Sequence, residues 1–153
     1  NQILFGEEIV CPQNYSVVAK KISLFHSKNN RNGQPLLTYK DIRSYLESNL
    51  YFIFFDDVSL SIIQVIELEA EIITLVVDSN FRNKNIGTRL LYKTLENLRL
   101  KKVKKIFLEV SEKNIAALKI YKKFGFIKYG IRKNYYIHNR LPTESAISMY
   151  TEL

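Results

Sequence analysis

The hydrophobic positions along this chain follow two periods, and the clearest change between them lies at residues 72–98. The run 72–77 is apolar and rich in β-branched residues, which is typical of a strand covered on both faces. The three polar residues 78–80 then end the run with side chains that favour turns. Apolar residues follow at helical spacing, at Ile86, Leu90, Leu91, Leu95 and Leu98. The segment therefore predicts a buried strand, a loop, and an amphipathic helix that begins near residues 85–88.

Comparable patterns predict elements on both sides of this segment. On the N-terminal side they are an edge strand within 1–14, helices at 16–27 and 39–48 separated by a turn-rich loop at 29–35, and strands at 51–55 and 60–67. On the C-terminal side they are a strand at 106–110, a helix at 114–123, a strand at 126–132, a tyrosine-rich loop at 134–143 and a strand at 146–152. Antiparallel strands followed by strand–helix–strand crossovers predict an α/β protein with a mixed sheet. The length suits one domain, 1–153.

The loop ahead of the predicted helix 86–98 combines positive charge, amides and a glycine. Its residues are Arg82, Asn83, Lys84, Asn85, Ile86, Gly87 and Thr88. A helix start presents unpaired backbone N–H groups and the positive end of the helix dipole, so it attracts phosphate. The glycine spacing fits neither a P-loop nor the dinucleotide fingerprint. The loop is predicted to hold a pyrophosphate; the alternative interpretation is a polar turn that caps an ordinary core helix.

The composition limits which kinds of site, and which cellular compartment, are expected for this chain. The single Cys11 cannot form an internal disulfide, and the two histidines, His26 and His138, lie too far apart to suggest a metal cluster, so no metal is expected. The chain shows neither a signal peptide nor an apolar run of about 20 residues, so we expect a cytoplasmic protein with no membrane partner.

The net charge of +8 invites a nucleic-acid hypothesis. Many of the lysines fall at 101–105 and 119–123, where they also fit a turn and solvated helix faces. Direct nucleic-acid binding is therefore not expected, although a basic surface could assist docking on a ribosome or attract an anionic coenzyme. We expect a monomer.

Two motifs carry a family resemblance. Residues 82–87 resemble the Gln/Arg-x-x-Gly-x-Gly/Ala signature of the GNAT acyltransferases, with Gly87 at the second glycine position and Asn85 at the first. Asn is the next best residue for a positive φ, which keeps the loop plausible. Residues 108–126 resemble the bacterial ribosomal-protein-alanine acetyltransferases, because Leu-Glu-Val, a later Asn, Ala-Ala, Ile-Tyr and Gly-Phe occur at matching spacing. With flanking residues the resemblance covers 69–136.

This resemblance implies the GNAT fold, a mixed and mostly antiparallel sheet of six to seven strands flanked by about four helices. It implies acetyl-CoA as cosubstrate and transfer of the acetyl group to the N-terminal α-amine of a protein, possibly a ribosomal one, by direct attack in a ternary complex. The implied coenzyme contacts are Leu75, Val76, Val77, the loop Arg82 to Thr88, Asn114, Ala117 and Tyr121. Two alternatives stay open: a GNAT enzyme that acts on a small-molecule amine or a lysine side chain, and a non-catalytic module that binds coenzyme or RNA.

The chemistry of amine acetylation selects two residues. A carboxylate must take a proton from an ammonium of pKa about 8, and Glu109 interrupts the face of the strand 106–110 that should be buried. The departing thiolate needs a proton donor, and Tyr121 lies one helical turn from Ala117. The plainer alternatives are a strand-end glutamate paired with a lysine and a core tyrosine. Asn114 is implied to bind pantetheine, or is a helix N-cap, or both.

The acceptor side is expected to involve Glu71, Tyr135 and Tyr136. Its walls are expected to come from the helix–loop–helix around 29–35 and from the loop that carries the two tyrosines. Glu71 precedes the central strand and ranks below Glu109 as a base. A backbone N–H near Val76 or Val77 is expected to meet the oxyanion. The two histidines are expected at the surface or in loops, and Cys11 has no activating partner nearby, which argues against an acetyl-cysteine intermediate.

Overall fold

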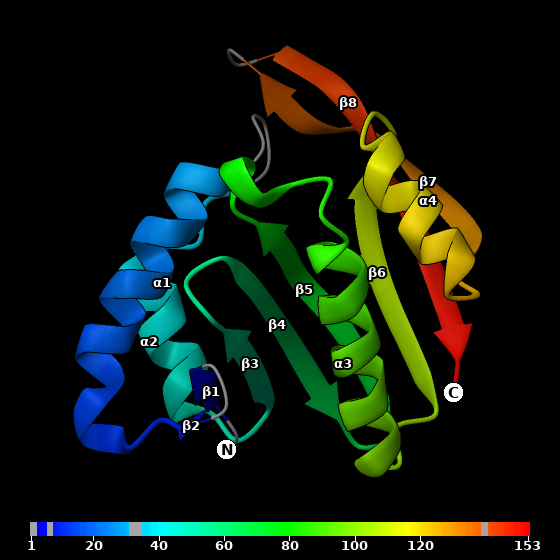
Figure 1. The fold of residues 1–153 in the computed structure, drawn as a ribbon. Coiled ribbons are helices and arrows are strands. Elements are labelled where there is room, and N and C mark those ends of the chain that lie inside the picture. The colour runs from blue at the N-terminus through cyan, green and yellow to red at the C-terminus, as the bar shows by residue number, and fades with distance from the viewer. Residues whose placement is uncertain (1–2, 6–7, 31–34, 139–140) are drawn as a thin grey trace.

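The computed structural model of the chain describes residues 3–5, 8–30, 35–138 and 141–153. Within these residues an eight-stranded sheet has the order β2-β1-β3-β4-β5-β6-β8-β7 (Figure 1). The strands are β1 (Ile3–Phe5), β2 (Glu8–Ile9), β3 (Tyr51–Phe55), β4 (Ser59–Ile66), β5 (Glu69–Val77), β6 (Lys105–Ser111), β7 (Ile127–His138) and β8 (Leu141–Glu152). The β1–β3 and β5–β6 pairs are parallel, and the other five pairs are antiparallel. The predicted mixed, mostly antiparallel sheet is confirmed, and the short β1 and β2 bring it to eight strands.

Helices cover both faces of the sheet. They are α1 (Tyr15–Asn29), α2 (Tyr39–Glu47), α3 (Ile86–Leu100) and α4 (Ile115–Lys123), with short 3-10 turns at Pro12–Asn14 and Ser79–Phe81. One core packs α1 and α2 against one face and contains Ile22, Leu46 and Ile62. A second core packs α3 and α4 against the other face and contains Leu91 and Ile106 (Figure 1). No helix in the described ranges is both long and apolar enough to cross a membrane.

The strand β5 separates from β6 halfway along its length. Residues Glu69–Ile72 pair with Lys105–Leu108, and neither strand continues the pairing, although β5 runs on to Val77 and β6 to Ser111 (Figure 1). On the other side of β5, Ile63 pairs with Ile72 and Ile62 with Thr74, which makes Ile73 a bulged residue. A bulge bends and twists its strand, which is consistent with β5 leaving β6 at this point.

Two sequence predictions about local structure were wrong. Residues 134–143 were predicted as a loop, but β7 and β8 continue as a hairpin in which Tyr136 pairs with Glu144 and Ile137 with Pro142. Pro142 is tolerated because β6 pairs with β8 only from Ala146 onward, so the proline needs no N–H for a second strand of the described sheet. The helix predicted at 16–27 ends two residues later, at Asn29, and that extension shapes the site.

Candidate active site

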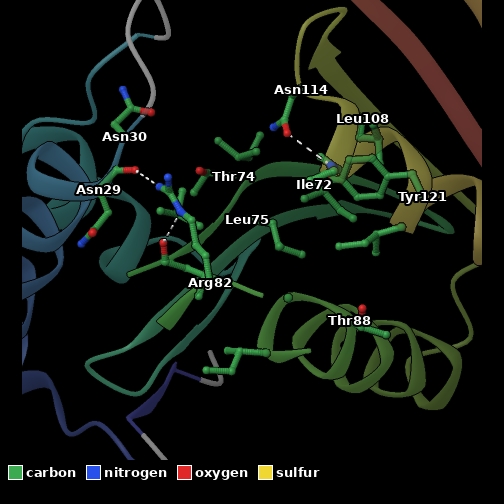
Figure 2. Close-up of a pocket in the computed structure, with 18 of the residues that line it drawn as sticks. Asn29, Asn30, Ile72, Thr74, Leu75, Arg82, Thr88, Leu108, Asn114 and Tyr121 are labelled. Atoms are coloured by element: carbon green, nitrogen blue, oxygen red, sulfur yellow. Dashed lines mark hydrogen bonds between the residues drawn. The ribbon is translucent and has the colours of Figure 1, made fainter. Parts of the chain in front are cut away.

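A pocket of about 760 Å³ lies where β5 and β6 diverge. Its walls come from the end of α1, from β5, from the loop before α3, from β6 and from α4 (Figure 2). The predicted site residues that line it are Glu71, Leu75, Val76, Val77, Arg82, Asn83, Asn85, Ile86, Gly87, Thr88, Glu109, Asn114, Ala117, Tyr121 and Tyr135. Lys84 is not among the lining residues, because its ammonium lies over the Phe81 ring, 5.2 Å from the centroid. The side chain of Tyr136 lies outside the described part of the structure.

The loop before α3 contains two residues in the left-handed conformation. Asn83 has φ 62° and Asn85 has φ 60°, a region that Asn adopts more readily than any residue except Gly. Asn85 is the N-cap of α3, and its carbonyl accepts the N–H of Arg89 at 3.0 Å. The N–H groups of residues 86–88 therefore belong to the first helical turn, which has no acceptor within the helix. Because these residues line the pocket, the start of α3 can receive an anion there.

The Arg82 guanidinium is bonded to the protein backbone. Its Nη2 donates to the carbonyl of Asn29 at 3.0 Å, and its Nε donates to the carbonyl of Val77 at 3.4 Å (Figure 2). Asn29 is 3% exposed, and its Oδ1 accepts the N–H of Ser79 at 3.0 Å while its Nδ2 donates to the carbonyl of Phe25 at 3.0 Å. The last turn of α1 is thus fastened to the loop after β5. Sequence patterns missed Asn29 because the polar residues 29–35 resemble a continuous loop.

Asn114 and Tyr121 lie across the pocket from Asn29 and Arg82 (Figure 2). Asn114 is the predicted N-cap of α4, and its Oδ1 accepts the N–H of Ala117 at 3.2 Å. The cap uses only the oxygen of the amide, so its nitrogen can donate to a ligand. Tyr121 is 7% exposed and packs against Phe126, with ring centroids 5.5 Å apart. It is therefore a core residue and a pocket residue at once.

Glu109 lies on the face of β6 opposite the buried Ile106 and Leu108, as the strand alternation predicted. Its side chain is 24% exposed, and its Oε1 accepts a hydrogen bond from Arg132 Nε at 2.9 Å. The ion-pair partner is therefore an arginine of β7, where the sequence alternative named a lysine. Arg132 also lies over the ring of Tyr135, 5.3 Å from the centroid. Arg132 and Tyr135 thus extend the site onto β7.

Glu71 lies at the rim of the pocket near Glu109. The β5–β6 register places Glu71 beside Phe107, two residues before Glu109, so both carboxylates point to the same face of the sheet. Loss of hydration and then the charge of Glu109 raise the pKa of Glu71, while the guanidinium of Arg132 acts in the opposite direction. Two carboxylates and one guanidinium therefore define a site that attracts a cationic group.

The prediction that His26 lies at the surface or in a loop was wrong. His26 is 2% exposed and lines the pocket, because it follows the buried Ile22 by four residues on the inner face of α1. Its Nδ1 accepts the N–H of Leu37 at 3.4 Å, and burial lowers the pKa of its ring. The backbone of His138 belongs to β7 rather than to a loop, and its side chain lies outside the described residues.

Comparison with known proteins agrees with this geometry. The model of the acetyltransferase (GNAT) family matches residues 26–126, more than half of the chain. This chain belongs to the GNAT acetyltransferase family. Its loop from Arg82 to Gly87 is therefore a variant of the family signature. Asn85 replaces the first glycine and adopts the positive φ that glycine favours.

Individual relatives add detail. The [ribosomal protein bS18]-alanine N-acetyltransferase of Salmonella typhimurium is 35% identical over 78 residues, which are 51% of this chain and 53% of the relative. The chain thus spans about half the length of the curated relatives that it matches. The solved ribosomal-protein-S18-alanine N-acetyltransferase from Escherichia coli has a TM-score of 0.78 at 24% identity and covers 89% of this chain and 88% of its own. A Bacillus subtilis acetyltransferase solved in complex with CoA has a TM-score of 0.55 at 17% identity, with 63% and 69% coverage. The two solved structures support the fold.

Proposed function

We propose that this protein transfers the acetyl group of acetyl-CoA to the N-terminal α-amine of a protein. The observation that carries the proposal is one pocket that joins a carboxylate, Glu109, and a phenol, Tyr121, to the open N-terminus of α3. The family supports acetyl transfer. The names of the relatives supply the acceptor class, an alanine of a ribosomal protein, and the family resemblance implies that this alanine is N-terminal.

The described residues fit the coenzyme. The N–H groups at the start of α3 suit a diphosphate, and the left-handed Asn83 and Asn85 give the loop the curvature to surround it. Among the described residues, β5 has no strand partner on the β6 side beyond Ile72, so its peptide groups near Leu75 to Val77 are available to the amides of a pantetheine arm. Asn114 and Ala117 border the same space from α4.

Each step of the proposed reaction is assigned to a group of this chain. Glu109 Oε1 is held by Arg132, which leaves Oε2 to take the proton from the acceptor ammonium, directly or through water. The freed amine forms a bond to the thioester carbon, and a backbone N–H near Val76 stabilises the oxyanion. The C–S bond then breaks, and Tyr121 donates its phenolic proton to the departing thiolate. The second proton leaves the nitrogen of the new amide and passes through water to restore the phenol of Tyr121. The acceptor enters beside Glu71, Tyr135 and Tyr136, and its positive charge is matched by the two carboxylates.

Mass spectrometry of peptides that begin with Ala, Ser or Met, incubated with acetyl-CoA, tests this function. We expect acetylation of the α-amine, and a fall in kcat of about 10²–10⁴-fold in Glu109→Gln and in Tyr121→Phe, because each removes one proton-transfer group. CoA binding measured by calorimetry should stay within about threefold in both variants, since the diphosphate site is intact.

Glu112→Gln is the matched control, because Glu112 follows β6 and accepts the N–H of Ser145 outside the pocket. If only lysine side chains are acetylated, the acceptor is a lysine amine and the proposed α-amine acceptor is wrong. Absence of labelling together with tight RNA binding would refute catalysis.

A further inference from the structure

One network of hydrogen bonds joins the loop before α3 to the part of the pocket wall that the last turn of α1 forms. The guanidinium of Arg82 donates to the carbonyl of Asn29, and the N–H of Ser79 donates to the Asn29 side chain. Both donors belong to the segment between β5 and α3, and Asn29 belongs to the last turn of α1, 50 residues earlier in the chain. Figure 2 shows Arg82 reaching across to Asn29.

Asn29 leaves little freedom at this junction. Its backbone carbonyl, Oδ1 and Nδ2 are each bonded, to Arg82, Ser79 and Phe25 respectively, and the residue is 3% exposed. Breaking any one of these bonds would leave a buried polar atom without a partner, which costs free energy. A shift of the loop that carries Arg82 and Ser79 therefore moves the last turn of α1 with it. Arg82 also places a positive charge at the C-terminus of α1, where helix carbonyls attract cations.

The last turn of α1 also begins the segment 29–35 that is expected to form a wall for the acceptor, and residues 29, 30 and 35 of that segment line the pocket. His26 lies one turn before Asn30, whose N–H donates to the carbonyl of His26 at 2.8 Å. The ring of His26 accepts the N–H of Leu37, the residue that precedes the N-cap of α2. Arg82 therefore bonds to Asn29 and Leu37 bonds to His26, and Asn29 and His26 belong to the same last turn of α1. All four residues line the pocket.

We infer that Arg82 and Asn29 are positioning residues that couple coenzyme binding to the wall that receives the acceptor. This inference rests on the proposed function, because it needs a coenzyme at the start of α3. The loop that closes on the diphosphate carries Arg82 and Ser79, and through Asn29 it fixes the last turn of α1 and the segment at Leu37. The Arg82 side chain thus acts on the backbone of α1 rather than on the phosphate.

Hydrogen exchange of the full chain with and without CoA tests the coupling without an acceptor. In the wild type, CoA should slow exchange at residues 86–90 and also at residues 26–30 and 37, by about fivefold or more at each site. Arg82→Lys keeps the positive charge but loses the planar fork that serves two carbonyls. In Arg82→Lys we expect protection to persist at 86–90 and to disappear at 26–30.

A kinetic measurement gives a second readout. With the alanine-starting peptide of the acetylation assay, Arg82→Lys should raise the KM for peptide by about 5–10-fold and leave kcat within about twofold, because the reacting groups are untouched. Ser27→Ala is the control for a weakened end of α1, since the exposed Ser27 hydroxyl donates to the carbonyl of Leu24 within the same helix. Ser27→Ala should retain both protection patterns and the wild-type KM.

Three outcomes would overturn the inference. Protection at 26–30 that survives in Arg82→Lys would show that the link carries no coupling. Wild-type protection confined to 86–90 would leave the coenzyme site intact and remove the coupling. Absence of CoA protection at 86–90 in the wild type would refute the coenzyme site, and with it both proposals.

Discussion

At the scale of single residues, Asn85 explains how the chain departs from a family signature and keeps its geometry. The signature has glycine at this position, and the structure places Asn85 at φ 60° and ψ 15°. Asn tolerates this region because its short polar side chain can compensate the steric cost. The positive φ was foreseeable from the sequence, because few other residues could replace glycine there.

The conformation of Asn85 predicts the effects of two substitutions. Asn85→Gly should keep CoA binding within about threefold, because glycine adopts a positive φ without strain. Asn85→Val should destabilise the fold by about 1–2 kcal/mol and weaken CoA binding, since a β-branched residue resists this conformation. Thermal melts and calorimetric titration measure the two effects. Equal CoA affinities for the Val and Gly variants would contradict the assigned role of the loop.

The raised pKa of Glu71 predicts how the stability of the fold depends on pH. Its pKa is raised above the ordinary value of 4.5, so the folded chain holds this proton more tightly than the unfolded chain does. Ionised Glu71 therefore destabilises the fold above its folded-state pKa, and this effect vanishes as the pH falls below 4.5. Glu71→Gln should raise the melting temperature at pH 7 and leave it unchanged below pH 4.5.

Glu69→Gln, on the same strand, controls for the loss of one negative charge in a basic protein. A gain in melting temperature for Glu71→Gln that is the same at both pH values would show that burial and the Glu109 charge are not its source.

The residues that sequence could identify are those whose role follows from a local pattern. Asn114 caps its own helix, and the alternation of β6 places the carboxylate of Glu109 on the face opposite the buried Ile106 and Leu108. Asn29, His26 and Arg132 act through partners that are distant in the chain, such as Ser79 for Asn29 and Glu109 for Arg132. Only the folded chain brings these pairs together, so their contacts leave no periodic signal in the sequence.

At the scale of elements, the strand–loop–helix unit at the centre of the chain was predictable, whereas the bend in its strand was not. The apolar run 72–77 gives no sign that Ile73 is a bulge, because a bulge depends on the register with β4. The long β7–β8 hairpin was missed for a related reason. Pro142 argues against a strand in isolation, and it is permitted here because the pairing of β8 with β6 begins only at Ala146.

Helix α3 offers a test of the second glycine of the signature. A Cβ on Gly87 would lie 3.7 Å from side-chain atoms of both Ile120 and Val77, which is ordinary packing distance. Gly87→Ala should therefore stabilise the protein by up to about 1 kcal/mol and keep CoA binding within about threefold, because the N–H group remains. Gly125→Ala is the contrasting variant, since Gly125 has φ 87°, and it should destabilise by about 1–2 kcal/mol. Chemical denaturation compares the two, and a destabilised Gly87→Ala variant would contradict the packing argument.

At the scale of the whole molecule, the site lies at the junction of two separate cores. The core of α1 and α2 supports the wall at His26 and Asn29, and the core of α3 and α4 supports the start of α3 and Tyr121. The sheet between them opens at β5, so one pocket receives side chains from both layers. Each layer should therefore control one of the two substrates.

Leu46 and Leu91 form a matched pair for this division, because both are 0% exposed and belong to different cores. Leu46→Ala and Leu91→Ala should each cost about 2–5 kcal/mol of stability, from lost burial and the cavity that remains. If the layers act separately, Leu46→Ala raises the KM for the acceptor peptide more than that for acetyl-CoA, because it loosens the packing of α1. Leu91→Ala should do the reverse, because it loosens α3 beneath the diphosphate. Initial-rate kinetics with both substrates varied, at a temperature where both variants are folded, resolves the two constants, and equal shifts of both in each variant would refute the division.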